Sequence, residues 1–387
     1  MRKLALPFMF AVALTSQVSF AQESQPALKQ PSSCAETDSP EALREHVPVL
    51  PAVKAKFWNI DSAVGYGMRD FGNGVYALSD NGWQSAFLVT NAGIIVFDAP
   101  ASYGKHIPEA VAKVTSQPIK MLVYSHLHKD HIGGSIAFRN TPGLQIIALD
   151  TVSDFLKQVN DPNRLIPTET FKTSKTIKLG GKTVELTRHN YHSNEGDLFI
   201  YVLEAKFLMA VDSVTSGYVP FQDFDLTTNF NEYLKMFDEI LAYKFDYFIG
   251  GHLTDTGTRK DVEITKEYTN DVYQTVKRIH NGMNERAFDA EIANTIGPDN
   301  AFLTFKAFLD KVTRDSVAEL EPRWINRLAG VDVWPPSHVR AALIYVRWDD
   351  KESVTLRLSG PQAGSEGKSV GAIWAANSLN ARTGRVR

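Results

Sequence analysis

The chain has 387 residues, with 41 lysines and arginines against 44 aspartates and glutamates and a formal net charge of −3 at pH 7. General nucleic-acid binders are usually basic, so this charge argues against nucleic acid as a partner. The one cysteine, Cys34, excludes an intrachain disulfide, and a chain of this length buries enough apolar surface to fold without one.

The first residues have the pattern of a secretory signal peptide. Arg2 and Lys3 precede an apolar run, and residues 19–21 are Ser-Phe-Ala, a small-x-small cleavage pattern. The run is shorter than the roughly 20 apolar residues of a membrane-spanning helix, so we expect residues 1–21 to be removed after Ala21. An uncleaved anchor is the alternative. We therefore expect a periplasmic or secreted protein with no membrane span in its mature chain.

A leader and a strand meander follow. Residues 22–53 are rich in Pro, Ser, Gln and Glu without sustained periodicity, which is typical of a flexible leader. Residues 75–78, 85–89 and 93–97 are strand-like, and Asn- and Gly-containing turns separate them as in an antiparallel meander. Asp98 closes the third strand.

The next elements form a β-α-β unit that ends in a cluster of polar residues. Residues 102–115 have apolar side chains at helical spacing, and residues 119–124 form a short buried strand after Pro118. Directly after this strand the chain places three imidazoles and one carboxylate within six residues, followed by two glycines. These four residues are His126, His128, Asp130 and His131.

This cluster predicts a metal site. In extended backbone His126 and His128 point to the same side, because side chains alternate with period two. Asp130 and His131 follow across the turn and face a second point nearby. Neutral imidazole and carboxylate are good ligands for zinc and neighbouring transition metals. Only ten histidines occur in the chain, so three in one short window are not explained by ordinary surface positions.

The remaining chain alternates strands and helices and then becomes helical. The expected elements are a short helix at 135–140, a strand at 144–149, a helix at 151–159, a hairpin of 176–179 and 182–187, strands at 198–203, 206–212 and 245–249, and a helix at 231–242. Further helices are expected at 259–283, 288–296 and 301–328. Trp324, Trp334 and Trp348 indicate that this last part packs on the rest, and residues 351–387 are expected to be loosely ordered.

The motif His-x-His-x-Asp-His followed by Gly-Gly resembles the signature of the metallo-β-lactamase fold superfamily. The resemblance implies an α/β (α+β) fold, a four-layer αββα sandwich. We assign the metallo-β-lactamase-like domain to residues 54–256 and an added carboxy-terminal helical extension to residues 257–350.

The resemblance also implies a histidine ligand after the hairpin. In the family such a histidine stands shortly before a Gly-Asp or similar pair, and His192 has this place before Gly196-Asp197. Three residues separate His192 from the glycine, where two are common. His189 is the competing candidate, although a supporting role beside the ligands fits it better.

Two later strand ends complete the implied ligand set. Asp212 resembles the bridging carboxylate of the glyoxalase-II and lactonase branches, whereas the best-known lactamase subclass has a cysteine there. A helix cap or turn is the alternative role for Asp212. Asp98 resembles the aspartate that ends the corresponding strand in the superfamily, and a turn cap that braces the metal loop is its alternative role. His252 follows an apolar strand and a Gly-Gly turn and resembles the last ligand.

The implied chemistry is hydrolysis by two metal ions. His126, His128 and His192 would hold one Zn²⁺ and Asp130, His131 and His252 the other, with Asp212 and a hydroxide between them; iron or manganese are alternatives to zinc. Asp130 would also orient the hydroxide that attacks the substrate. The expected pocket residues are Trp83, Tyr218 and Phe221.

A secreted or periplasmic hydrolase of a small ester, lactone or lactam is the favoured function, with a small molecule as its partner. A mononuclear iron protein similar to persulfide dioxygenases, a phosphodiesterase-type hydrolase on the same fold and a non-catalytic metal binder stay open. His128 argues against a flavodiiron-like protein, which has a glutamate at this point.

Overall fold

The computed structural model describes residue 43 and residues 46–254 and 256–351. The predicted signal peptide, Cys34, most of the predicted leader and the predicted tail from residue 352 lie outside the described residues.

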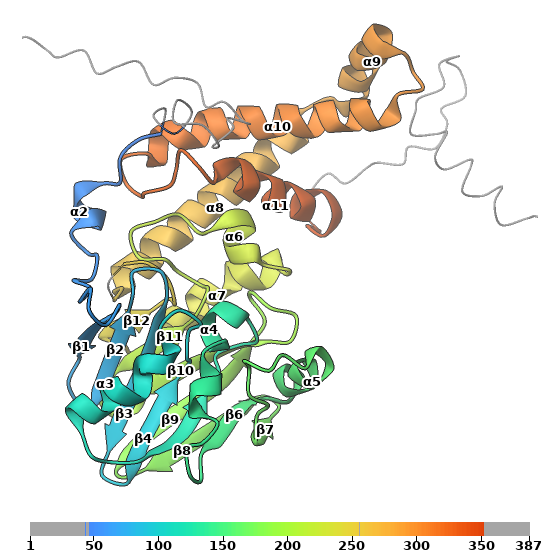
Figure 1. Cartoon of the computed structure of the whole chain (residues 1–387). Helices are drawn as coiled ribbons and strands as arrows, with labels where there is room; N and C mark the ends of the chain where they lie inside the picture. Colours follow the sequence, from blue (N-terminus) through green and yellow to red (C-terminus); the bar gives the residue numbers. More distant parts are fainter. Residues whose placement is uncertain (1–42, 44–45, 255, 352–387) are drawn as a thin grey trace, which may run out of the picture. The chain divides into compact units, whose positions relative to one another are not determined.

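The first sheet has seven strands in the order of the sequence (Figure 1). They are β1 (Gly67–Asp70), β2 (Val75–Ser79), β3 (Gln84–Thr90), β4 (Gly93–Phe97), β5 (Ile119–Val123), β6 (Gln145–Leu149) and β7 (Glu169–Phe171). The strands from β1 to β4 are antiparallel, as the meander predicts, and those from β4 to β7 are parallel. The outermost strands β1 and β7 were not expected from the sequence.

Parallel neighbours require crossover connections, and helices supply them. The 3-10 turn η1 (Gly104–His106) and α3 (Ile107–Val114) join β4 to β5, and α5 (Asp150–Val159) follows β6. Between β5 and β6 the chain forms two short turns, α4 (Lys129–Ile132) and η2 (Ser135–Phe138). The apolar faces of α3 and α5 are buried in the same core as this sheet.

The second sheet has five strands in the order β12-β11-β10-β9-β8. They are β8 (Ser174–Leu179), β9 (Lys182–His189), β10 (Asp197–Val202), β11 (Phe207–Ala210), which follows η3 (Leu203–Ala205), and β12 (Tyr247–Ile249). Gly180 and Gly181 turn the β8–β9 hairpin with φ angles of 51° and 83°, which glycine adopts without steric cost.

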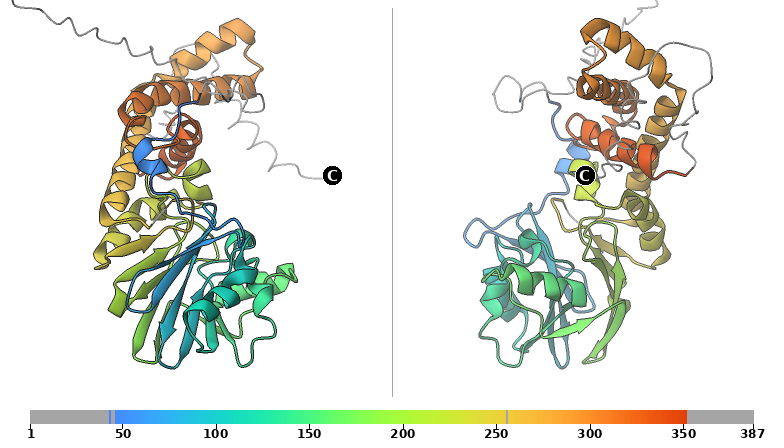
Figure 2. Two further views of the ribbon diagram at one scale, coloured as in Figure 1. Left: turned by 60° about the vertical axis from the view of Figure 1, so that its left-hand side comes forward. Right: turned by 90° about the vertical axis from the view of Figure 1, so that its right-hand side faces the viewer.

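Strand β10 shows how the layers pack. All of its residues are buried. Leu198, Ile200 and Val202 belong to the core that the two sheets share. Phe199 and Tyr201 point the other way, into a core formed with helices. Each such side chain contributes about 1.5–3 kcal/mol by burial. Two facing sheets with helices outside them, visible in Figure 2, confirm the expected sandwich.

The helices of the second core include the carboxy-terminal region. They are α7 (Phe230–Ala242), α8 (Arg259–Gly282), α9 (Glu285–Ile296), α10 (Ala301–Trp324) and α11 (Pro335–Trp348). Thr258 and Asp261 form a capping box that begins α8. Helix α10 ends at Trp324, four residues before the predicted end, and Pro322 lies in its last turn. No helix of the described ranges is long and apolar enough to cross a membrane.

The described end of the predicted leader contacts this helical region. His46 Nδ1 lies 3.0 Å from Oδ2 of Asp332, and the same oxygen accepts a hydrogen bond from Val47 N at 2.8 Å. The short helix α2 (Pro51–Lys54) follows, and Val53 is buried. His46 and Val47 therefore attach this segment by polar contacts to the connection between α10 and α11.

Candidate metal centre

The loop after β5 is stabilised by a hydrogen bond from its backbone to Asp98. The Asp98 carboxylate follows β4 and accepts a hydrogen bond from Ser125 N at 2.8 Å, so Asp98 braces the loop as one of its two predicted roles requires. His126 and His128 stand on this loop. Asp130 and His131 lie in the short helix α4, which begins directly after His128.

The second sheet supplies the other three residues. His192 follows β9, Asp212 follows β11 and His252 follows β12. The Asp197 carboxylate accepts hydrogen bonds from the amides of His192, at 3.0 Å, and Ser193, at 3.1 Å. These bonds stabilise the loop between His192 and Gly196, which is one residue longer than is common in the family. Asp212 has a left-handed backbone, with φ of 56°, and its amide donates to Gly250 O at 2.9 Å. The position of each of these three side chains is therefore determined by the end of the strand that precedes it.

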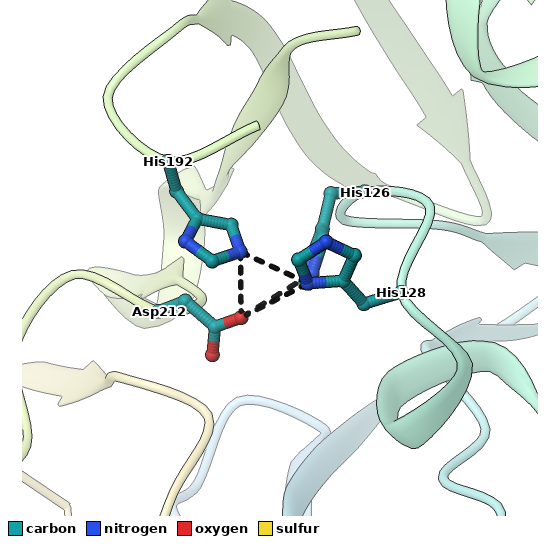
Figure 3. Close-up of side chains that lie close together, drawn as sticks. All are labelled: His126, His128, His192 and Asp212. Carbon is teal, nitrogen blue, oxygen red and sulfur yellow. Dashed lines mark hydrogen bonds and ion pairs between the residues drawn. The ribbon is translucent and has the colours of Figure 1, made fainter. Parts of the chain in front are cut away.

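Four of the residues form one compact group, drawn in Figure 3. The ligand atoms of His126, His128, His192 and Asp212 lie within 4.8 Å of one another. His192 Nε2 is 3.0 Å from His128 Nδ1, and Asp212 Oδ2 is 3.2 Å from His192 Nε2 and 3.3 Å from His126 Nε2. Two ligands of a tetrahedral zinc ion with bonds of about 2.0 Å are about 3.3 Å apart. The spacing fits a metal ion.

The other three residues form a second group beside the first. The ligand atoms of Asp130, His131 and His252 also lie within 4.8 Å of one another. His131 Nε2 is 3.1 Å from His252 Nε2 and 3.3 Å from Asp130 Oδ2. His131 is fully buried, whereas the side chains of His252 and Asp130 are 28% and 38% exposed, which leaves this group open to a molecule from solution.

Asp212 joins the two groups through its two oxygens. Oδ2 faces His126 and His192 in the first group. Oδ1 faces the second group, 2.9 Å from His252 Nε2 and 3.2 Å from His131 Nε2. One carboxylate thus presents a separate oxygen to each group, which is the arrangement of a bridging ligand.

Hydrogen bonds on the far side of the rings determine which nitrogen faces inward. Ser125 Oγ bonds to Nδ1 of His126 at 3.0 Å, and Nδ1 of His252 donates to Gly82 O at 3.1 Å. Nδ1 of His192 donates to the main-chain carbonyl of Asp225. Such outer partners fix the tautomer and orientation of a metal-binding imidazole. Asp225 was not expected from the sequence, because a main-chain carbonyl leaves no residue-type signal.

Burial and charge set the protonation of the first group. Burial lowers the pKa of His126 to about 3 and that of His192 to about 4, despite the nearby Asp212 carboxylate. Both rings are therefore neutral at pH 7, as metal binding requires. Burial would raise the pKa of Asp212, but His131, His252 and His192 hold it well below the usual value, so Asp212 is a carboxylate.

Two buried atoms test whether a metal ion fits. His126 Nε2 and Asp212 Oδ1 are inaccessible to solvent, and the polar atoms nearest to them, Asp212 Oδ2 at 3.3 Å and His252 Nε2 at 2.9 Å, belong to the ligand groups themselves. Buried polar atoms are normally satisfied, and both of these point into the ligand groups. Five imidazoles and two carboxylates are a donor set that suits divalent zinc, iron or manganese. The residues fit metal ions.

The expected pocket residues lie in different places. Trp83 belongs to the site, since its Nε1–H donates to Asp130 Oδ2 at 3.1 Å. Tyr218 pairs with Ala329, and the Phe221 ring packs on Trp334 with centroids 4.8 Å apart. Tyr218 and Phe221 therefore contact the carboxy-terminal region, and their role as pocket residues stays a prediction.

His189, the competitor of His192, has other partners. Its Nδ1 is 2.7 Å from Oε2 of Glu239 on α7, and its ring stacks on Phe199 with centroids 3.6 Å apart. It belongs to neither of the two groups. The structure brings His192 rather than His189 to the centre.

Comparison with known proteins identifies the domain that carries this centre. Residues 84–252 match the model of the metallo-beta-lactamase superfamily. These residues hold the two groups and most of both sheets. This part of the chain is a metallo-beta-lactamase superfamily domain, as the histidine motif led us to expect.

Individual relatives carry the same name. Metallo-beta-lactamase IND-1 of Chryseobacterium indologenes is 27% identical over 111 residues, which are 28% of this chain and 45% of that protein. The match thus spans less than half of that relative. Among solved structures, a metallo-beta-lactamase from Pontibacter korlensis has a TM-score of 0.46 and 16% identity over 52% of this chain and 97% of that chain. Metallo-beta-lactamase IND-7 has a TM-score of 0.45 and 21% identity over 52% and 96%.

Proposed function

We propose that the protein is a metal-dependent hydrolase that holds two zinc ions and cleaves a small ester, lactone or lactam. The observation that carries the proposal is the position of Asp212, whose two oxygens face the two ligand groups separately. A single ion would use one group, and a complete second group would then have no purpose. The match to the metallo-beta-lactamase superfamily supports hydrolysis as the reaction class.

The chain's own residues would divide the work. His126, His128 and His192 would hold one ion, Asp130, His131 and His252 the other, and Asp212 both. Two ions held in this way would lower the pKa of a water molecule toward neutrality and would polarise the oxygen of the scissile group. No serine or cysteine nucleophile is then required. The Asp130 side chain is 38% exposed and would orient the attacking water.

The substrate would enter from the open side. His128, Asp130 and His252 are the partly exposed members of the two groups, while His126, His131, His192 and Asp212 form the buried floor. Trp83 lies at this mouth beside Asp130 and would contact a bound molecule. The names of the relatives make a lactam one substrate to test, and the carboxylate at position 212 favours esters and lactones.

We also propose that the protein is exported. The basic start, the apolar run and the Ser-Phe-Ala sequence of residues 19–21 support this location. Amino-terminal sequencing of the protein recovered from cells would test it, with a first residue of Gln22 as the expected result and an intact Met1 as the contrary one.

Metal analysis tests the proposal first. The purified protein should contain two zinc ions per chain and lose activity in a chelator. Esters, lactones, chromogenic lactams and phosphodiesters should be assayed side by side. One iron per chain, with oxygen consumption on a persulfide, would instead establish the dioxygenase alternative. Hydrolysis of phosphodiesters alone would establish the phosphodiesterase alternative.

Two histidines near each other provide a matched pair of variants. His192→Ala should remove one metal ion and nearly all activity, because it deletes a ligand. His189→Ala should keep both ions, because His189 bonds to Glu239 instead. Loss of metal in His189→Ala with full metal in His192→Ala would refute the ligand assignment.

A further inference from the structure

The segment α6 (Gln222–Leu226) is a left-handed turn built from residues with side chains. The φ angles of Asp223, Phe224 and Asp225 are 51°, 58° and 56°, and that of Leu226 is 59°. This conformation costs an L residue about 1–2 kcal/mol relative to the right-handed form. It persists only where the surrounding structure holds it in place.

One side of the turn holds a metal-centre residue. The carbonyl of Asp225 accepts the Nδ1–H of His192, and the Asp225 carboxylate in turn accepts a hydrogen bond from Tyr233 OH at 2.8 Å. The Thr228 amide donates to His192 O at 3.4 Å. Because Nδ1 and Nε2 are on opposite sides of the ring, the position of the Asp225 carbonyl determines where His192 Nε2 points.

The other side of the turn is attached to α11 by polar contacts. Arg340 Nη2 lies 2.9 and 2.8 Å from the two carboxylate oxygens of Asp223. The Asp223 amide donates to Ser337 Oγ at 3.0 Å. Figure 1 shows α6 beside α11, although more than a hundred residues separate them in the sequence.

A buried histidine of α11 completes the attachment. His338 Nε2 donates to the carbonyl oxygens of Pro220 and Phe221, both at 2.9 Å, just before the turn begins. Its ring stacks on the fully buried Phe224, with centroids 4.5 Å apart and planes inclined by 26°. Helix α11 therefore contacts the turn in three ways. Ser337 and His338 bond to the backbone of the turn and of the residues just before it, Arg340 pairs with the Asp223 carboxylate, and the His338 ring stacks on Phe224.

We propose that α11 positions the His192 imidazole by holding α6 in its left-handed form, so that Arg340, Ser337 and His338 are positioning residues of the metal centre. None of the three lies in that centre. Release of α6 from α11 would let the turn relax toward a less strained backbone and would move the Asp225 carbonyl away from His192. The inference rests on the proposed function, because it takes His192 as a metal ligand.

The test compares two exposed arginines of the helical region. Arg340→Ala removes the pair with Asp223. Arg327→Ala is the control, because Arg327 makes an equivalent two-bond pair with Glu267, at 2.9 and 2.6 Å, away from α6. Both variants are made in a His252→Ala background, in which only the first ligand group is complete. Zinc affinity is measured by competition with a chromophoric chelator.

Arg340→Ala should weaken zinc binding by about tenfold, the lower end of the usual effect of losing an outer partner. Arg327→Ala should leave it unchanged. Asp223→Ala should match Arg340→Ala, and the double variant should add no further loss. In the metal-free protein, amide hydrogen exchange of residues 190–194 should be faster in Arg340→Ala than in Arg327→Ala.

Equal zinc affinity and equal exchange in the two arginine variants would overturn the proposal and leave α11 as a packing element. If the wild-type chain binds no metal, the proposed function fails on its own. The positioning role is then decided by exchange in the metal-free protein: faster exchange of residues 190–194 in Arg340→Ala supports it, and equal exchange refutes it.

Discussion

Trp83 donates its indole Nε1–H to Oδ2 of Asp130, the oxygen that faces His131. The bond fixes the carboxylate at the exposed edge of the second ligand group. Trp83→Phe keeps an aromatic ring but removes the donor, so Asp130 should lose its orientation. We expect metal binding at the second group to weaken by about tenfold.

Metal titration followed by absorption of bound cobalt would measure this loss. Trp348→Phe is the control, since Trp348 is exposed on α11 and outside both groups. Unchanged binding in Trp83→Phe would mean that Asp130 is held by other contacts.

Asp212 is the residue whose replacement should change the metal count most. Its negative charge would lie between the two proposed cations, which would otherwise repel each other. Asp212→Asn keeps the shape and loses the charge; Asp212→Cys replaces oxygen with a softer thiolate that bridges with different geometry. Both variants should bind the second metal ion more weakly. Their rate of hydrolysis should fall by more than about 100-fold, which exceeds the usual effect of losing a residue that only hydrogen-bonds to a metal ligand.

Metal content and turnover across a zinc titration would test this expectation. Two tightly held ions and undiminished turnover in the Cys variant would show that Asp212 is a structural turn residue, the alternative that its left-handed backbone also allows.

Leu226 offers a test of strain in α6. Its side chain is 48% exposed and its φ is 59°. Glycine adopts this angle freely, so Leu226→Gly should be more stable than Leu226→Ala by about 1 kcal/mol. At an ordinary exposed position the order is the reverse. Denaturant unfolding of the two variants would measure the difference, and a less stable glycine variant would contradict the strain.

His338 should make the fold less stable in acid. Burial lowers its pKa to about 4, against about 6.5 in an unfolded chain. The unfolded state therefore binds more protons between these values, and the contribution to stability is present above pH 6.5 and is lost as the pH falls toward 4. The groups that face the ring are Tyr268 OH, 2.8 Å from Nδ1, and the Asp223 carboxylate paired with Arg340.

Between pH 7.5 and pH 5 the loss should be about 2 kcal/mol of unfolding free energy. Denaturant unfolding of metal-free wild type and His338→Gln at the two pH values would isolate it. His338→Gln should show a smaller pH dependence than wild type. Equal pH dependence in the two proteins would show that His338 does not titrate in this range.

The sequence was most informative where residue type and strand ends coincide. The motif of His126 to His131 and the strands before Asp212 and His252 were enough to predict the sandwich, and the structure brings these residues together with His192. The helical region was also expected. The short strands β1 and β7 were missed, because four or three residues at a sheet edge give little periodic signal.

The turn α6 could not have been predicted. Its sequence, Gln-Asp-Phe-Asp-Leu, contains no glycine that would favour a left-handed backbone. The conformation is determined by contacts with α11, far away in the sequence. The contact of Phe221 with Trp334 likewise joins residues far apart in the sequence, and the role of Phe221 as a pocket residue stays a prediction.

Both sheets are built from strands in the order of synthesis, β1 to β7 first and β8 to β12 afterwards. Each strand pairs mainly with its neighbour in sequence, so the first sheet can form while the ribosome still makes the second. At that stage the four residues of the histidine motif lie at the edge of the first sheet, before His192, Asp212 and His252 have been synthesised. The ligand set is complete only once residue 252 has been added, and α11, which holds α6 beside His192, is made later still. We therefore expect metal loading to come late in folding and not to nucleate it.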